Sequence, residues 1–190
     1  MNNKEFLGTA PIGRLLFKLA VPTVAAQLIN MLYNIVDRIF IGHIPGVGDL
    51  ALTGVGVCLP IIMTVSAVAA LVGSGGAPRA SIAMGERRID SAEKILGNCF
   101  SLQILVSVIL TTVLLVFNRP LLLAFGASEN TIEYACDYMG IYALGTIFVQ
   151  LTLGMNAFVT AQGCSKISMI SVGIGAISNI LLDALFIYGT

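Results

Sequence analysis

The chain has 190 residues, of which only 11% are charged. Counted with glycine and without tyrosine, the apolar share is roughly 65%, whereas soluble domains are about 45–50% apolar and about 25% charged. This composition excludes an ordinary soluble domain and a disordered chain. Ten basic residues against ten acidic ones leave no net charge for phosphate contacts, which excludes a nucleic-acid binder. An integral membrane protein remains.

Five stretches are long and apolar enough to cross a bilayer as helices, which takes about 20 residues each. The sequence therefore predicts an all-α polytopic bundle with five spans in residues 1–190. The spans are expected at Leu16 to Ile41, Leu50 to Gly73, Ile95 to Phe117, Tyr134 to Thr160, and Ile167 to Gly189. Turn residues separate them at 42–49, 75–78, 118–120 and 162–166.

Basic residues are concentrated on one side of these spans. With a cytoplasmic N-terminus, eight of the ten lie inside, at Lys4, Arg14, Lys18, Arg79, Arg87, Arg88, Lys94 and Lys166. The positive-inside rule then predicts a multi-pass protein of the cell membrane whose residue 190 faces outward. The segment 85–94 is expected to be a charged, partly helical cytoplasmic connector.

Three ionisable residues lie well inside the spans, namely Asp37, Arg38 and Asp183. A charge inside hydrocarbon is costly, so each marks a candidate functional site. Counted from the cytoplasmic entry of its span, Asp37 lies roughly 27 Å up and Asp183 roughly 22 Å up. We therefore expect the two carboxyl groups to meet in the outer half of the bilayer.

Polar residues gather on one face of the first and fifth spans. At 100° per residue, the first-span set falls within about 140° of arc, and it includes Gln27, Asn30, Tyr33, Asn34 and Asp37. Asn179 lies one turn before Asp183 in the fifth span, and Asn156 belongs to a polar row in the fourth. These faces are predicted to line a bundle interior or a wet cavity, with Gln27, Asn30 and Asn34 as polar lining residues.

A carboxyl pair in a low-dielectric site suits the binding of a proton or of Na⁺, and Asp37 and Asp183 are the candidates for either ion. The structural alternative is a polar cluster that only joins helices. Arg38 either neutralises Asp37 or extends toward the interface. Pro22 removes a backbone hydrogen bond, which permits a hinge or a static kink. One histidine and four scattered cysteines argue against a zinc site, and no cofactor is expected.

Several segments together resemble the N-terminal part of a MATE (multidrug and toxic compound extrusion) family transporter. They are the run from Pro22 to Gly42 with its YNIVDRIFIG, the segment AMGERRIDSAEK at 83–94, the turn AQG at 161–163, and SNILLDALFIYG at 178–189. The resemblance covers essentially the whole chain. No single motif is decisive, but their order and spacing are specific.

The resemblance implies twelve spans in two six-helix lobes around a central cavity, with no catalytic chemistry. The chain would supply five helices of the first lobe and would lack the second lobe. Asp37, Asp183, Asn179, Tyr33 and Asn156 would form the cluster that binds the coupling cation, and the first helix would bend at Pro22. The implied function is antiport, in which H⁺ or Na⁺ drives export of cationic, amphipathic drugs or toxic metabolites.

Two other functions fit parts of the sequence. A lipid-linked precursor flippase of the same wider superfamily shares the helical layout, but it would need cationic cavity residues, for which only Arg38 is available. An intramembrane aspartyl protease also uses two aspartates on neighbouring helices. Its second aspartate typically follows Gly-x-Gly, whereas Asp183 follows two leucines.

Overall fold

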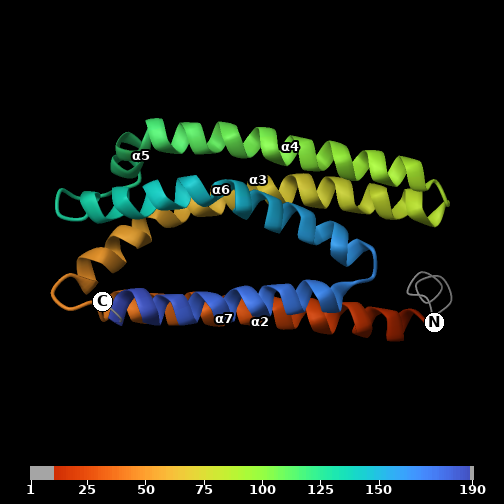
Figure 1. Cartoon of the computed structure of the whole chain (residues 1–190), viewed down its shortest axis with the longest axis horizontal. Helices are drawn as coiled ribbons and strands as arrows, with labels where there is room; N and C mark the ends of the chain where they lie inside the picture. The colour runs from red at the N-terminus through yellow and green to blue at the C-terminus, as the bar shows by residue number, and fades with distance from the viewer. Residues whose placement is uncertain (1–10, 189–190) are drawn as a thin grey trace. The chain divides into compact units, whose positions relative to one another are not determined.

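The computed structural model describes residues 11–188, and all of their regular secondary structure is helical (Figure 1). The helices are α2 (Ile12–Gly42), α3 (Gly48–Gly85), α4 (Ile89–Val116), α5 (Asn118–Ala124), α6 (Ile132–Ala161) and α7 (Ser165–Tyr188). Five of them, all except α5, are long and apolar enough to cross a membrane. The predicted all-α bundle with five spans is confirmed. The predictions that fall on Lys4, Gly189 and Thr190 lie outside the described residues.

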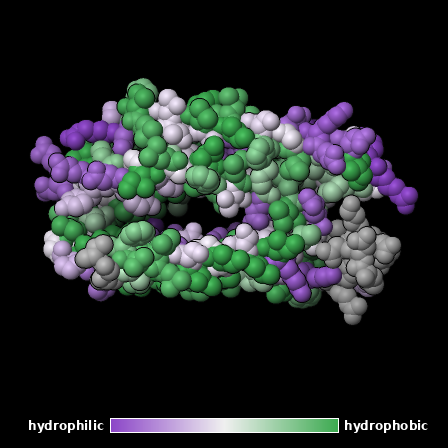
Figure 2. All heavy atoms as spheres, viewed as in Figure 1, coloured by the Kyte–Doolittle hydropathy of each residue, from purple (hydrophilic) through white to green (hydrophobic). Residues whose placement is uncertain are grey.

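The surface of these helices is apolar where lipid would touch it. Side chains such as Ile141 and Phe148 are 75% and 72% exposed although they lie in the middle of α6. On the face drawn in Figure 2, hydrophobic residues cover the middle of the helices and hydrophilic residues gather at the helix ends. A soluble protein rarely exposes such continuous apolar area, so the surface is that of a multi-pass membrane protein.

The chain divides into two compact units. The first joins the residues up to Ile44 with those from Phe158 onward, and in it α2 and α7 lie side by side. Ala26 on α2 and Ala176 on α7 are both buried. Small side chains let membrane helices approach closely, which increases their van der Waals contact.

The second unit, Pro45–Ala157, contains α3, α4, α5 and most of α6. Its core is built from Cys58, Ile61 and Val65 of α3, Leu122 of α5 and Met139 of α6. Two glycines of α3 allow it to approach α6 closely. A Cβ added at Gly54 would lie 3.1 Å from the Ala135 nitrogen, and one added at Gly73 would lie 2.8 Å from the Gly154 oxygen.

Two of the predicted turns are wrong. Residues 75–78 lie inside α3, where Gly76 and Ala77 are buried and the helix continues to Gly85. Pro78 removes one backbone hydrogen bond without ending the helix, because the buried residues Gly76, Ala77 and Ala80 keep this part of α3 packed. Residues 118–120 open α5, because a proline in the first helical turn loses an N–H that has no helical partner.

The other predicted connections agree with the structure. The helices α2 and α3 are separated by residues 43–47, and α6 and α7 by residues 162–164. The charged connector at 85–94 is partly helical, as predicted, because α4 begins at Ile89. Between α3 and α4 the backbone turns through Arg87, whose φ is 61°. The Arg88 nitrogen donates to the Ala83 oxygen at 2.9 Å and the Arg87 nitrogen to the Met84 oxygen at 3.1 Å, which is a Schellman helix end.

Gly73→Ala is expected to destabilise the fold by about 1–3 kcal/mol, because its methyl group would overlap the α6 backbone. Gly75→Ala is the matched control, since nothing lies within 4 Å of a Cβ built there. Unfolding midpoints in detergent measure both effects. Equal midpoints for the two variants would contradict the close approach of α3 and α6.

Arg87→Gly is expected to stabilise the fold by about 1 kcal/mol, because glycine adopts a positive φ without the steric cost of a Cβ. Arg88→Gly has no such backbone benefit and serves as the control for loss of charge. A lower midpoint for Arg87→Gly than for the unmodified chain would mean that the arginine side chain contributes more than its backbone strain costs.

Candidate cation site on helices α2 and α7

The structure brings Asp37 and Asp183 together. Both helices run in the same direction in Figure 1, and each aspartate lies five residues before the end of its helix. The two carboxyl groups lie close enough to interact with each other. Two ionised carboxylates at such a distance repel each other, so the arrangement favours a bound proton or cation.

Two oxygens beside this contact have no hydrogen-bond partner in the described part of the chain. They are the Asp183 Oδ2 and the Asn179 Oδ1, and both are buried. Asn179 lies one turn before Asp183 on α7, so the two side chains share a face. An unsatisfied buried oxygen costs about 1–3 kcal/mol, and a proton or a small hard cation would remove that cost.

Arg38 lies close enough to Asp37 for electrostatic attraction between the guanidinium and the carboxylate. Its side chain is half-buried, as are those of Asp37 and Asp183. With both acids ionised, the three side chains carry one net negative charge. A single monovalent cation therefore neutralises the group.

The remaining predicted site residues are more dispersed. Tyr33 is half-buried on α2, one turn before Asp37. Gln27 and Asn34 are exposed, and Asn34 donates through Nδ2 to the Asn30 oxygen at 2.7 Å. Asn156 is half-buried on α6 within the second unit, so its membership of the site stays a prediction.

Pro22 is buried and lies inside α2, which is helical on both sides of it. Next to it, Thr23 donates through Oγ1 to the Leu19 oxygen at 2.9 Å. A proline inside a helix removes one backbone hydrogen bond and weakens resistance to bending at that turn. Pro22 is therefore placed where a hinge could act, fifteen residues before Asp37.

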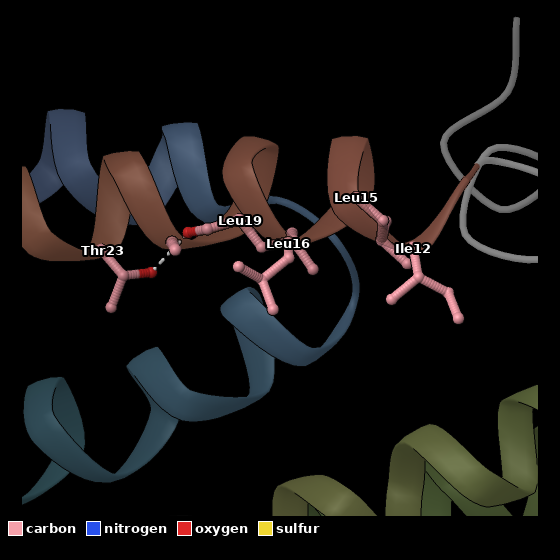
Figure 3. A pocket seen from close by; sticks show the side chains of 6 residues that line it. Ile12, Leu15, Leu16, Leu19 and Thr23 are labelled. Atoms are coloured by element: carbon pink, nitrogen blue, oxygen red, sulfur yellow. Dashed lines mark hydrogen bonds between the residues drawn. The ribbon is translucent and has the colours of Figure 1, made fainter.

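A shallow apolar hollow lies along the first part of α2 (Figure 3). Its lining residues are Ile12, Leu15, Leu16, Leu19, Ala20 and Thr23. Thr23 lies fourteen residues before Asp37, which is about 21 Å along a helix, so the hollow is separate from the carboxyl pair. The aspartates and the asparagine supply only oxygen ligands, and residues 11–188 contain no group of three or more His, Cys, Asp or Glu side chains placed to hold a metal ion.

The fold and the carboxyl pair define a helical multi-pass membrane protein with an acidic site in its spans. A profile of the MatE family matches residues 22–185, and the chain belongs to this family. The FAD transporter of Shewanella oneidensis is 25% identical over 189 residues, which are 100% of this chain and 41% of that protein. The multidrug export protein MepA of Staphylococcus haemolyticus is 28% identical over 174 residues, 90% of this chain and 37% of that protein.

Solved structures agree with the family assignment. The MATE multidrug transporter DinF-BH is 36% identical with a TM-score of 0.88 over 96% of this chain and 40% of that chain. A MATE structure in the bent conformation has a TM-score of 0.89 at 24% identity, covering 100% of this chain and 41% of that chain, and shows the shared fold. The chain thus spans about two fifths of the length of these proteins.

Cysteines placed at the two acids should test the contact directly. In a background with the native cysteines changed to alanine, Asp37→Cys with Asp183→Cys is expected to form a disulfide on mild oxidation, because the two side chains touch. Ile39→Cys with Asp183→Cys is the control, since Ile39 is 55% exposed and lies on another face of α2. Mass spectrometry of the digested protein detects the bridge, and equal yields from both pairs would refute the contact.

Proposed function

We propose that this chain supplies the cation-binding lobe of a secondary transporter that exports small molecules in exchange for H⁺ or Na⁺. The observation that carries the proposal is the carboxyl pair of Asp37 and Asp183 on adjacent spanning helices. The unpartnered oxygens of Asp183 and Asn179 support it, because they leave coordination open for one cation. Purely structural helix pairing would need no unsatisfied oxygens.

Coupling follows if the cation and the exported molecule favour different conformations of the bundle. In the proposed cycle, H⁺ or Na⁺ enters from outside and neutralises the group formed by Asp37, Asp183 and Arg38. Loss of the negative charge removes repulsion between α2 and α7 and allows α2 to bend near Pro22. The bend changes which face of α2 contacts the substrate, and the substrate is released to the outside. Tyr33, one turn before Asp37 on α2, is the further residue of the cation cluster in the first unit.

The proposed substrates are cationic, amphipathic drugs or toxic metabolites. Relatives named as multidrug export proteins and the multidrug transporter DinF-BH support this class. A flavin nucleotide is the second candidate, because the FAD transporter matches the whole of this chain. A flippase for lipid-linked precursors has less support, since Arg38, the basic residue on the polar face, already faces Asp37.

The proposed location is the cell membrane, with Lys18 at the cytoplasmic end of α2 and the two acids toward the outside. In this orientation, H⁺ or Na⁺ that moves inward down its gradient reaches the site from the outside of the membrane. Gln27, Asn30 and Asn34 then follow along α2 toward the cytoplasm as polar residues of the transport cavity. No cofactor takes part in the proposed cycle.

Efflux of ethidium from cells that express the full gene tests the proposal, with Na⁺ and the pH gradient varied separately. Unmodified protein is expected to lower dye retention several-fold under one of the two gradients. Asp37→Asn and Asp183→Asn are each expected to abolish this effect while the protein still inserts. A neutral amide supplies no negative charge to bind either ion. The gradient on which efflux depends identifies the coupling ion.

Asp49→Asn is the matched control, because Asp49 is an exposed acid in the first turn of α3 and should not affect efflux. FAD export is measured in parallel in the same cells. Export of FAD without export of the dye would move the substrate class to flavin nucleotides. Full, gradient-driven efflux in both aspartate variants would refute the coupling role of the carboxyl pair.

A further inference from the structure

Two glutamines are completely buried in the second unit. Gln103 on α4 and Gln150 on α6 are both 0% exposed. Gln103 donates through Nε2 to the Ala69 oxygen at 3.0 Å, and Gln150 donates through Nε2 to the Val65 oxygen at 3.0 Å. Both acceptors are backbone oxygens of α3, four residues apart. The helices α4 and α6 are therefore hydrogen-bonded to consecutive turns of one helix.

The amide oxygens of both glutamines are buried and have no partner in the described part of the chain. Their orientation is fixed by chemistry, because a backbone carbonyl only accepts and the amide nitrogen must face it. Rotating either amide by half a turn would place two acceptors against each other. Each Oε1 therefore points away from α3 and lacks a donor, at a cost of about 1–3 kcal/mol.

The two amides lie about one helical turn apart. Their acceptors on α3 are separated by one pitch, about 5.4 Å. On α6, the Gln103 amide covers Gly154, where an added Cβ would lie 1.9 Å from Nε2, and Gln150 lies one turn before Gly154. The Gln103 amide and the Gln150 residue thus lie on neighbouring turns of α6.

We propose that Gln103 and Gln150 together bind one internal water molecule. A water has two O–H donors at an angle of roughly 105°, and each reaches an acceptor at about 2.8 Å, so one molecule joins two oxygens about 4.5 Å apart. Two amides one helical turn apart need to incline toward each other by only about 1 Å to be bridged in this way. The second N–H of either amide donates to the water oxygen, which gives the three hydrogen bonds typical of buried water.

A neutral ligand suits this site better than a metal ion. The buried polar side chains of the described residues are Gln103, Ser107, Thr131, Thr146, Gln150, Ser165 and Ser168, none of which is charged. A cation between two neutral amides would be a buried charge without a counter-charge. The inference is independent of the proposed function, because these residues lie in the second unit and the carboxyl pair in the first.

Ser107 is the competing donor. It lies one turn along α4 from Gln103, is 0% exposed, and its hydroxyl donates to the Ile104 oxygen at 2.7 Å. Because α3 and α4 are joined by a short turn and run antiparallel, Ser107 is level with Val65. If its hydroxyl turned toward Gln150, one amide would be satisfied without water.

A structure of the protein expressed from its full gene, determined at about 2 Å resolution, tests the proposal. The expected result is one density peak within about 3.2 Å of the Oε1 atoms of both Gln103 and Gln150. Absence of such a peak would overturn the proposal, and a Ser107 hydroxyl directed at Gln150 would then identify the donor that replaces the water.

A double-mutant cycle of Gln103→Met and Gln150→Met provides a second readout. A shared water predicts that the unfolding midpoint of the double variant falls clearly less than the sum of the two single drops. Gln103→Met with Thr131→Val is the control, because Thr131 is a buried residue bonded to Ser128, and those drops should add. Additive drops for the glutamine pair would contradict a shared water.

Discussion

The structure depends on the cost of placing two carboxyl groups in a membrane. Asp37 and Asp183 come from helices far apart in the sequence, and their carboxyl groups lie close enough to repel each other when both are ionised. A charge that lies among membrane-spanning helices is costly unless it is paired or neutralised. The pairing of α2 with α7 is therefore tied to the charge state of the two acids, and this link is what a coupled transporter requires.

The second unit provides the opposite property, a tightly packed body. Gly54 and Gly73 allow α3 to approach α6 at two points, and the buried glutamines bond α4 and α6 to α3. Such contacts resist small displacements because close-packed interiors do not deform continuously. In contrast, α2 contains Pro22 and polar side chains along its length. The chain thus combines a tightly packed helical unit with a polar helix that carries the candidate cation site.

Much of the fold could be predicted from the sequence. The five spans follow from apolar length alone, and the meeting of Asp37 with Asp183 follows from depth and helical face. The two turn errors have different causes. A helix can continue through a single proline when its neighbours are packed, as α3 does at Pro78, and a proline in the first turn can open a helix, as Pro120 does in α5. The sequence leaves the role of Arg38 open, because the direction of an arginine side chain depends on neighbours in three dimensions.

The buried glutamines could not be recognised from the sequence. Gln103 and Gln150 stand alone in apolar stretches, and their common partner α3 is defined by the register between helices rather than by spacing along one of them. The same limit applies to Asn156, which shares a polar row on its own helix but lies in the second unit. The residue pattern within one helix predicts which side chains share a face of that helix. Which residues of two helices contact each other can be determined only from the structure.

The central claim is that one cation is shared between Asp37 and Asp183. Infrared difference spectroscopy of the purified protein from the full gene, between acidic and alkaline pH, tests it most directly. A carboxylic acid band that disappears in both Asp37→Asn and Asp183→Asn, or that Na⁺ displaces in the unmodified protein, is the predicted result. A band that persists unchanged in both variants would show that the proton is bound elsewhere.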